Sequence, residues 1–337
     1  MDRNASIDGL RGVCAVCLVI FHMTVRYSAL YLDDVFSDFL FVNRWGDIFS
    51  SVFLMISSYF LYAPYKNQFE FWKYLKNKFW RLWPLYFLAV TFIFVITRFY
   101  YLPDRTGELK DYFFNIIMLN GYIGTLYIDG SHWYMTTLLS AIIIIGILRY
   151  YKVDDQPVSY LIWMIAAFLI NCLATLTDNT SRDVIYGIGK VLCNPYVGVI
   201  CVGIGFHKGI NDMKNNKALL GRGWLTMICL GFCISLLLLG VWRTIGMIVG
   251  MIALSVCIYF PKSLLSLKIF VALGSISYPV YLVHQNIGYL IQNQLILKTG
   301  YYNRAYAVVA IVATIICGLM LNILEKNLRK FIAKRDC

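Results

Sequence analysis

The first strongly apolar stretch of the chain, SIDGLRGVCAVCLVIFH, carries three side chains whose types and spacing suit anion binding and proton transfer. Arg11 and His22 are eleven residues apart. On an α-helix this separation is three turns plus about 20°, so both side chains project from one face, about 16 Å apart along the axis. Asp8 precedes Arg11 by one turn and lies on the same face. A guanidinium binds anions, and an imidazole accepts and returns a proton near neutral pH.

This helix face suits a long ligand whose anionic end lies at Arg11 and whose reactive end reaches His22. With a cytoplasmic N-terminus, Arg11 and Asp8 lie near the inner membrane surface and His22 lies in the outer half of the bilayer. The geometry alone leaves a second interpretation open. In it, His22 makes an interhelical hydrogen bond and Arg11 extends along the helix to the membrane surface.

A second basic cluster stands in the segment FWKYLKNKFWRLWPLY, which contains Lys73, Lys76, Lys78 and Arg81 among aromatic residues. Lys78 and Arg81 are one helical turn apart, so they could hold a phosphate group together. The alternative is a cytoplasmic anchor, in which the cations contact lipid headgroups and the aromatic rings lie at the membrane interface.

The remaining histidines are weaker candidates. His132 is expected at the outer end of a membrane helix and His284 in the outer half of another, so both could face the same cavity as His22. His207 is expected at the cytoplasmic interface. The four histidines do not have the spacing of metal ligands, so we expect no metal site. No glutamate falls in the middle of an apolar span, which argues against a carboxylate proton relay.

Composition determines the class of structure that must position these residues. Hydrophobic residues make up 60% of the 337 residues and charged residues 14%, and the mean hydropathy is +0.66. An ordinary soluble domain is nearer one half apolar and one quarter charged. We therefore predict an all-α, polytopic membrane helical bundle, with lipid covering part of the apolar surface.

About ten transmembrane helices are expected, with both termini in the cytoplasm. The predicted spans are residues 9–29, 46–63, 82–100, 131–149, 158–177, 186–206, 224–241, 244–260, 269–290 and 305–324. The apolar segment 111–127 is short and interrupted by glycines, so we interpret it as interfacial or re-entrant. In this layout twenty of the 30 Lys and Arg residues lie on the cytoplasmic side, which follows the positive-inside rule. Residues 1–337 are expected to form one membrane domain, without a fused extracytoplasmic domain.

The net charge of +12 does not indicate nucleic-acid binding, because the basic residues lie in short loops between apolar spans. Nine of the ten cysteines fall in apolar runs, so no disulfide framework is expected. Cys14 and Cys17 form a C-x-x-C motif inside a predicted membrane helix, where packing is favoured over redox or metal chemistry. The first apolar stretch lacks the features of a cleavable signal peptide.

Five segments in order resemble acyltransferase family 3, a group of integral membrane acyltransferases. SIDGLRGVCAVCLVIFH is similar to that family's Asp-Gly-x-Arg start and Arg-x10-His signature. The others are FLMISSYFLY, NKFWRLWPLY, SHWYMTTLLSAII and GSISYPVYLVHQNI, which are similar to its second-helix segment, its basic junction, its Trp-containing helix and its Ile-Ser-Tyr-x-x-Tyr-Leu-x-His segment. The likeness runs from residue 6 to residue 287, nearly the whole chain.

The resemblance implies ten core helices and transfer of an acyl group, usually acetyl, from cytoplasmic acyl-CoA to a hydroxyl of a surface or lipid-linked glycan. It implies that His22 is the essential histidine, a general base or an acyl relay through a covalent acetyl-histidine. Arg11 would orient the donor, and Arg81 would lie near the CoA phosphates. Lys78 stands where the family has an arginine, which keeps the charge but loses the planar fork. Guesses for the acceptor or oxyanion side are His132, Tyr278, Tyr281 and His284.

We therefore predict a membrane O-acetyltransferase in the cytoplasmic membrane, with acetyl-CoA as donor and no metal. Its partners would be the acyl-CoA, a glycan or lipid-linked saccharide acceptor and the lipid bilayer. Two other functions fit the same span count and charge bias. One is a transporter or flippase of lipid-linked glycans, and the other is a non-catalytic sensor of acyl-CoA. Neither requires an imidazole aligned with a cytoplasmic arginine.

Overall fold

The computed structural model describes residues 4–32, 35–62, 69–177, 179–214 and 221–335. Those residues are helical throughout, with connecting turns and without a β-strand, as predicted. The α-helices are α1 (Ala5–Phe21), α2 (Tyr27–Tyr31), α3 (Trp45–Leu61), α4 (Phe71–Phe99), α5 (Leu109–Ile116), α6 (Asn120–Ile123), α7 (Trp133–Tyr150), α8 (Pro157–Leu176), α9 (Asn179–Val191), α10 (Val197–Lys214), α11 (Arg222–Leu239), α12 (Val241–Tyr259), α13 (Lys268–Ser275), α14 (Ser277–Thr299) and α15 (Ala305–Arg335). A π-helix, η1 (His22–Arg26), and short 3-10 helices, η2 (Val42–Arg44), η3 (Gly130–His132) and η4 (Leu264–Ser266), complete the fold.

The distribution of side chains between surface and interior is that of a membrane protein. On α8, Val158, Ile162, Ile165, Leu169 and Leu173 are all exposed. Their spacing of three or four residues places them on one helix face, which water would not solvate well and lipid would. By contrast, α14 carries several buried polar side chains. The protein is therefore a multi-pass membrane protein whose interior is partly polar.

Seven stretches of the described chain are long and apolar enough to cross a membrane. They are Ala5–Tyr31, Phe71–Phe99, Gly130–Tyr150, Pro157–Leu176, Arg222–Leu239, Val241–Tyr259 and Ala305–Arg329. Each corresponds to one predicted span. The other three predicted spans fall on α3, which has 17 residues, on α10, which carries charges at its C-terminal end, and on the polar helix α14. The count of about ten spans and the cytoplasmic position of the termini therefore stay predictions.

Two predicted spans are divided in the structure. Residues 186–206 cross the turn between α9 and α10, where Pro195 interrupts the chain, and residues 269–290 cross the junction of α13 and α14 at Ile276. Segment 111–127 contains most of the short helix α5 and all of the short helix α6. Neither helix is long enough to span a bilayer. Helix boundaries at such breaks depend on local turns that hydropathy does not register.

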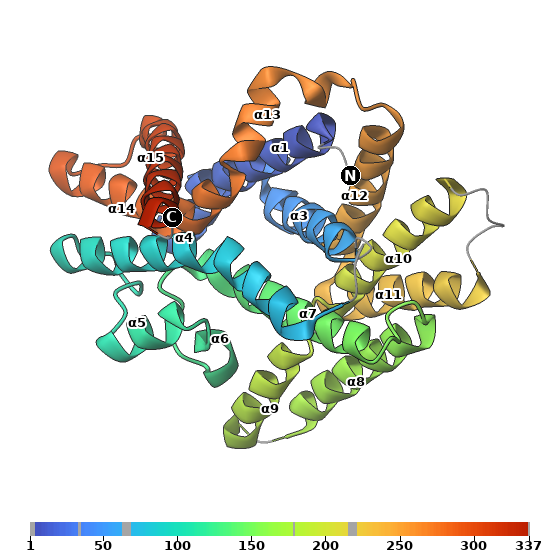
Figure 1. Ribbon diagram of the computed structural model, residues 1–337. Helices are drawn as coiled ribbons and strands as arrows, with labels where there is room; N and C mark the ends of the chain where they lie inside the picture. The colour runs from blue at the N-terminus through green and yellow to red at the C-terminus, as the bar shows by residue number, and fades with distance from the viewer. Residues whose placement is uncertain (1–3, 33–34, 63–68, 178, 215–220, 336–337) are drawn as a thin grey trace.

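Helix α1 lies inside the bundle, where it packs against α13, α3 and α14. Figure 1 shows α1 and α3 between α12 and α13 on one side and α4 and α7 on the other. Gly12 on α1 and Gly274 on α13 face each other so closely that a Cβ on either would overlap backbone atoms of the opposite helix. This contact between small residues fixes the orientation of α1 and therefore of its polar face.

Candidate active site

The polar face of α1 ends where the regular helix changes into a π-helix. His22 is the first residue of η1, and the backbone N–H of Tyr27 bonds to its carbonyl, five residues back. Helix α1 is regular through Phe21, so the expected three-turn separation between Arg11 and His22 applies. Single π-helical turns inside α-helices are frequently found at functional sites.

His22 contacts two side chains of α14. Its Nδ1 lies 3.2 Å from the hydroxyl of Tyr289, and its ring centroid lies 4.8 Å from that of His284 in an edge-on arrangement. Gln285 donates from Nε2 to the same Tyr289 hydroxyl at 3.2 Å. The imidazole therefore belongs to a polar cluster that joins α1 to α14, and its remaining ring nitrogen is not used by Tyr289.

Tyrosine rings form one wall beside this cluster. Tyr27 and Tyr31 pack against the ring of Tyr289, with centroids 5.4 and 5.7 Å away. Tyr302, in the connection before α15, stacks on Tyr27 and donates to Gln292 Oε1. Partial burial raises the pKa of Tyr302 to about 12, and the nearby positive charge of Arg304 opposes this rise without cancelling it. The Tyr302 phenol is therefore neutral at physiological pH.

The segment before α7 holds α14 in place through its backbone. The carboxylate of Asp129, fully buried, accepts from the backbone N–H of Asn286 at 2.9 Å and from the N–H and hydroxyl of Ser131. His132 Nε2 lies 2.9 Å from the carbonyl oxygen of Leu282. In a regular helix, that carbonyl and the N–H of residue 286 are each other's partners. Two side chains from one short segment thus bind one turn of α14, beside His284.

These contacts determine which ring nitrogens carry hydrogen. A carbonyl oxygen only accepts, so His132 donates from Nε2 and His284 donates from Nδ1 to the carbonyl of Tyr281 at 2.8 Å. His132 Nδ1 and His284 Nε2 are then the basic nitrogens of the neutral rings, and both are buried without a hydrogen-bond partner in the described chain. The lone pair of His284 is suited to accept from a hydroxyl of a bound molecule.

The two tyrosines proposed for the oxyanion side are already engaged. The Tyr278 hydroxyl donates to the carbonyl of Leu82 at 2.9 Å, and the Tyr281 hydroxyl donates to the carbonyl of Ser131. A phenol has a single hydrogen to donate. In this arrangement, stabilisation of an oxyanion by either residue requires that its present hydrogen bond be exchanged.

A series of ring contacts leads from Arg11 to His284. The Arg11 guanidinium lies over the ring of Phe53 at 5.9 Å. Phe53 contacts Tyr134, Tyr134 contacts Tyr281, and Tyr281 contacts His284, with centroids 5.6, 5.3 and 6.0 Å apart. The rings come from α3, α7 and α14, and they are packed together. Asp8 and Arg11 both engage in further interactions.

The basic cluster lies on the first turns of α4, where its members differ in burial. Lys78 is partly buried and its ammonium lies 5.5 Å from the ring of Tyr74. Arg149 of α7 is buried and lies over the same ring at 5.9 Å, with Asp154 as its ion-pair partner at 3.4 Å. Arg81 is exposed. Lys78 forms no ion pair in the described chain, and Lys76 and Arg81 add positive charge on the same turns of α4.

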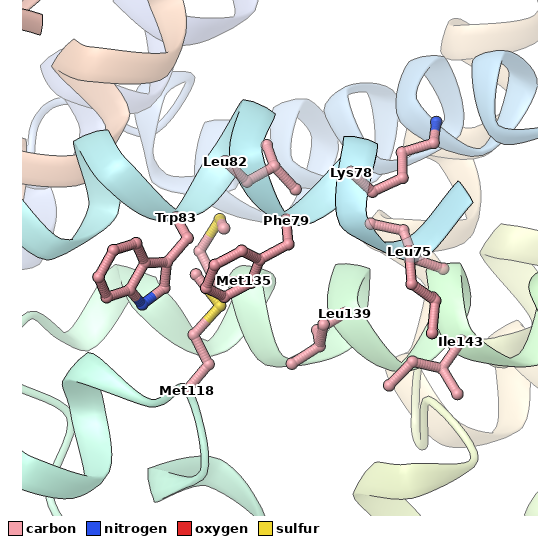
Figure 2. Close-up of a pocket in the computed structure, with 10 residues that line it drawn as sticks. Leu75, Lys78, Phe79, Leu82, Trp83, Met118, Met135, Leu139 and Ile143 are labelled. Carbon is pink, nitrogen blue, oxygen red and sulfur yellow. The ribbon is translucent and has the colours of Figure 1, made fainter. Parts of the chain in front are cut away.

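A cavity of about 190 Å³ adjoins Lys78 between α4 and α7. Figure 2 shows Phe79 and Trp83 from α4 opposite Met135 and Leu139 from α7, with the nitrogen of Lys78 directed away from this apolar lining. The lining residues include neither Arg11 nor His22. The cavity is therefore distinct from the polar cluster around His22.

A comparison with known protein families shows to which family the chain belongs. The family model described as an acyltransferase domain, acyltransferase family 3, matches residues 4–323. The chain belongs to acyltransferase family 3. No curated protein and no solved structure matches the chain. The match includes every site residue named above and covers nearly all of the chain, so the resemblance stated from the sequence motifs is confirmed.

Membership of acyltransferase family 3 makes this protein a membrane acyltransferase. The match does not itself assign roles to residues, so those of His22, Arg11, Lys78 and Arg81 stay predictions. Among the described residues, no group of three His, Cys, Asp or Glu side chains is placed to hold a metal ion. The nine described cysteines are free thiols.

Sequence reasoning missed three polar residues of the cluster that joins His22, α14 and the segment before α7. They are Tyr289, Gln285 and Asp129. One signal was available, because YLVHQNIGYLIQNQ is unusually polar for a helix inside a membrane bundle. The pairing of Asp129 with α14 has no such local signal.

Proposed function

We propose that this acyltransferase moves a short acyl group, acetyl in the first instance, from cytoplasmic acyl-CoA to a hydroxyl of a surface or lipid-linked glycan in the cytoplasmic membrane. The observation that carries the proposal is the position of His22, at the end of the α1 face that begins with Arg11 and in contact with the polar residues of α14. Cationic residues at the other end of α1 and on α4 supply the charge for the CoA phosphates.

His22 acts as the general base in this proposal. With Nδ1–H donated to the Tyr289 oxygen, Nε2 is free to take the proton of the acceptor hydroxyl. The hydroxyl oxygen then forms a bond to the thioester carbon, and a tetrahedral intermediate collapses with cleavage of the carbon–sulfur bond. The CoA thiolate leaves and receives the proton from the imidazolium. His284, whose Nε2 lone pair lacks a partner in the described chain, accepts a hydrogen bond from the acceptor.

The donor reaches His22 along the α1 face. Arg11, Lys78 and Arg81 bind the CoA phosphates, and Asp8 orients Arg11. The pantetheine arm then passes the packed rings of Phe53 and its neighbours, which must part to admit it. Bound water would be excluded from such an aromatic passage, which protects the thioester from hydrolysis.

The test measures transfer of label from radiolabelled acetyl-CoA by the purified protein in lipid vesicles. His22→Ala is expected to lower transfer by about 10²–10⁴-fold, the usual contribution of a general base. His207→Gln is the control, because His207 is another histidine of the chain but packs on Tyr59 and not on the polar cluster of α14. If neither wild type nor His22→Ala binds acetyl-CoA, the proposed acetyltransferase function is excluded. Movement of a lipid-linked glycan across the vesicle without acetyl-CoA would instead identify a flippase.

A further inference from the structure

Arg105 stands beside the polar cluster of His22, although neither motif nor hydropathy singled it out. It lies in the connection between α4 and α5, and its side chain is partly buried. Its Nη1 donates to Asn286 Oδ1 at 3.4 Å, and its guanidinium lies over the ring of Tyr289 at 5.6 Å. Tyr289 is also the partner of His22, so a single tyrosine separates the guanidinium from the proposed base.

The positive charge at this place is not neutralised by an ion pair. In the part of the chain that the structure describes, neither Arg105 nor Arg26, the last residue of η1, forms a salt bridge. Both guanidiniums are close enough for their charges to act on His22. Asp129 is committed to backbone and hydroxyl donors. Arg304 differs, since it is paired with Asp38 at 2.9 Å.

Arg105 and Gln285 pack closely together because residue 130 is a glycine. A Cβ at Gly130 would lie closer than 3.0 Å to both Arg105 Nη1 and Gln285 Oε1. Gln285 is buried, and its Oε1 has no hydrogen-bond partner in the described chain. A guanidinium and an unsatisfied amide oxygen thus lie together over one glycine, and any side chain at position 130 would displace them. Buried polar atoms without partners are uncommon and call for a ligand or water.

We propose that Arg105 and Gln285 form the acceptor subsite and that it selects a saccharide with an anionic group near the reacting hydroxyl. Arg105, assisted by Arg26, binds a carboxylate or phosphate of the acceptor, as guanidinium groups commonly do. Gln285 Oε1 accepts a hydrogen bond from a sugar hydroxyl. Gly130 allows the two side chains to come together. The anion then fixes the sugar with a hydroxyl directed at His22. This inference rests on the proposed function and names the class of its acceptor.

The experiment compares three acceptors that differ only in charge. Methyl glucoside is neutral, methyl glucuronoside carries a carboxylate, and methyl glucoside 6-phosphate carries a phosphate. Acetyl transfer is measured for wild type, Arg105→Gln, Arg105→Lys and Gly130→Ala, with Arg304→Gln as the control for a paired arginine. Wild type is expected to favour an anionic acceptor in kcat/KM by at least about tenfold, the usual scale of one charge-assisted contact. Which anion is favoured distinguishes a carboxylate from a phosphate acceptor.

Each variant has its own expected result. Arg105→Gln loses the preference for the anion, so that the ratio of kcat/KM for charged and neutral acceptors falls to about one, and Arg105→Lys regains part of the preference. Gly130→Ala weakens transfer to all three acceptors, because the methyl group displaces Arg105 and Gln285. Arg304→Gln behaves as wild type. Equal kcat/KM for charged and neutral acceptors in wild type, or a preference that survives in Arg105→Gln, would overturn the inference.

A second measurement separates this inference from the proposed function. The thermal stability of the protein is followed with each acceptor in the absence of acetyl-CoA. Stabilisation of wild type, but not of Arg105→Gln, by an anionic sugar supports the subsite even if no acetyl transfer is found. Absence of stabilisation by both anionic sugars overturns it. A transfer rate that follows the content of anionic lipid in the vesicle, rather than the charge of the acceptor, would assign the two arginines to headgroups and also overturn it.

Discussion

The carboxylate of Asp129 accepts a hydrogen bond from the backbone N–H of Asn286 at 2.9 Å, across a sequence separation of 157 residues. The same carboxylate holds Ser131 through two further bonds. One buried side chain therefore joins the segment before α7 to the turn of α14 that carries His284. The position of α14 relative to His22 depends on this connection.

Asp129→Asn replaces one accepting oxygen of the carboxylate by an amide NH2 group, which can only donate hydrogen bonds. Because both carboxylate oxygens of Asp129 accept from donors, one N–H or O–H group is then left facing another donor. We expect a loss of about 1–3 kcal/mol in stability, the cost of a buried unsatisfied group. The midpoint of thermal aggregation in detergent measures it. Asp104→Asn is the control, because Asp104 is exposed. Equal midpoints for wild type and Asp129→Asn would show that the carboxylate does not hold α14.

Tyr289→Phe removes the hydroxyl that contacts His22 Nδ1 and leaves the ring packing in place. Loss of a hydrogen bond that orients the imidazole, of about 1–1.5 kcal/mol, corresponds to a roughly tenfold lower kcat with KM for acetyl-CoA unchanged. Steady-state transfer kinetics give both values. Tyr302→Phe is a suitable control, since its hydroxyl bonds to Gln292 and not to His22. An unchanged kcat in Tyr289→Phe would mean that His22 needs no orienting partner.

The sequence predicted the elements of this site better than their contacts. The helix is regular from Arg11 to Phe21, the residue before His22, so the relation of Arg11 to His22 follows from helical geometry alone. Hydropathy located the strongly apolar spans because lipid exposure imposes a uniform requirement on them. The contacts of α14 depend instead on Asp129 and Gln285, whose partners are set by tertiary packing. The breaks at Pro195 and Ile276 are local turns within apolar sequence, so a hydropathy window runs across them.

Gly274→Ala tests the close packing that orients α1. A Cβ at Gly274 would overlap the backbone carbonyl of Asp8, and backbone atoms in a packed helix cannot move aside as a flexible side chain would. We expect a loss of at least about 1–3 kcal/mol in stability and a low yield of monodisperse protein. Gly221→Ala is the matched control, because a Cβ there meets no atom within 4 Å. Normal yield and stability of Gly274→Ala would show that α1 and α13 can separate without harm to the fold.

Lys78→Met tests whether the cation at the start of α4 binds the donor. The methylene stem of Lys78 lines the apolar cavity while its ammonium points away, so methionine preserves the packing and removes the charge. If the ammonium binds a CoA phosphate, KM for acetyl-CoA rises by about tenfold, kcat stays close to wild type, and the difference narrows at high salt because screening weakens the contact in wild type. Lys78→Arg retains the charge and is expected to keep the KM near wild type.

Lys73→Met provides the matched control for this measurement. Lys73 lies on the same turns of α4 but is exposed and paired with Glu70 at 3.1 Å, so its removal changes the overall charge of the region equally without touching the cavity. A KM that rises only in Lys78→Met identifies a specific contact with the donor. Equal increases in both variants would instead reflect the general positive potential of this end of the bundle, which attracts an anionic donor without a defined binding residue. An unchanged KM in Lys78→Met would remove Lys78 from the donor site and leave Arg11 and Arg81 as its candidates.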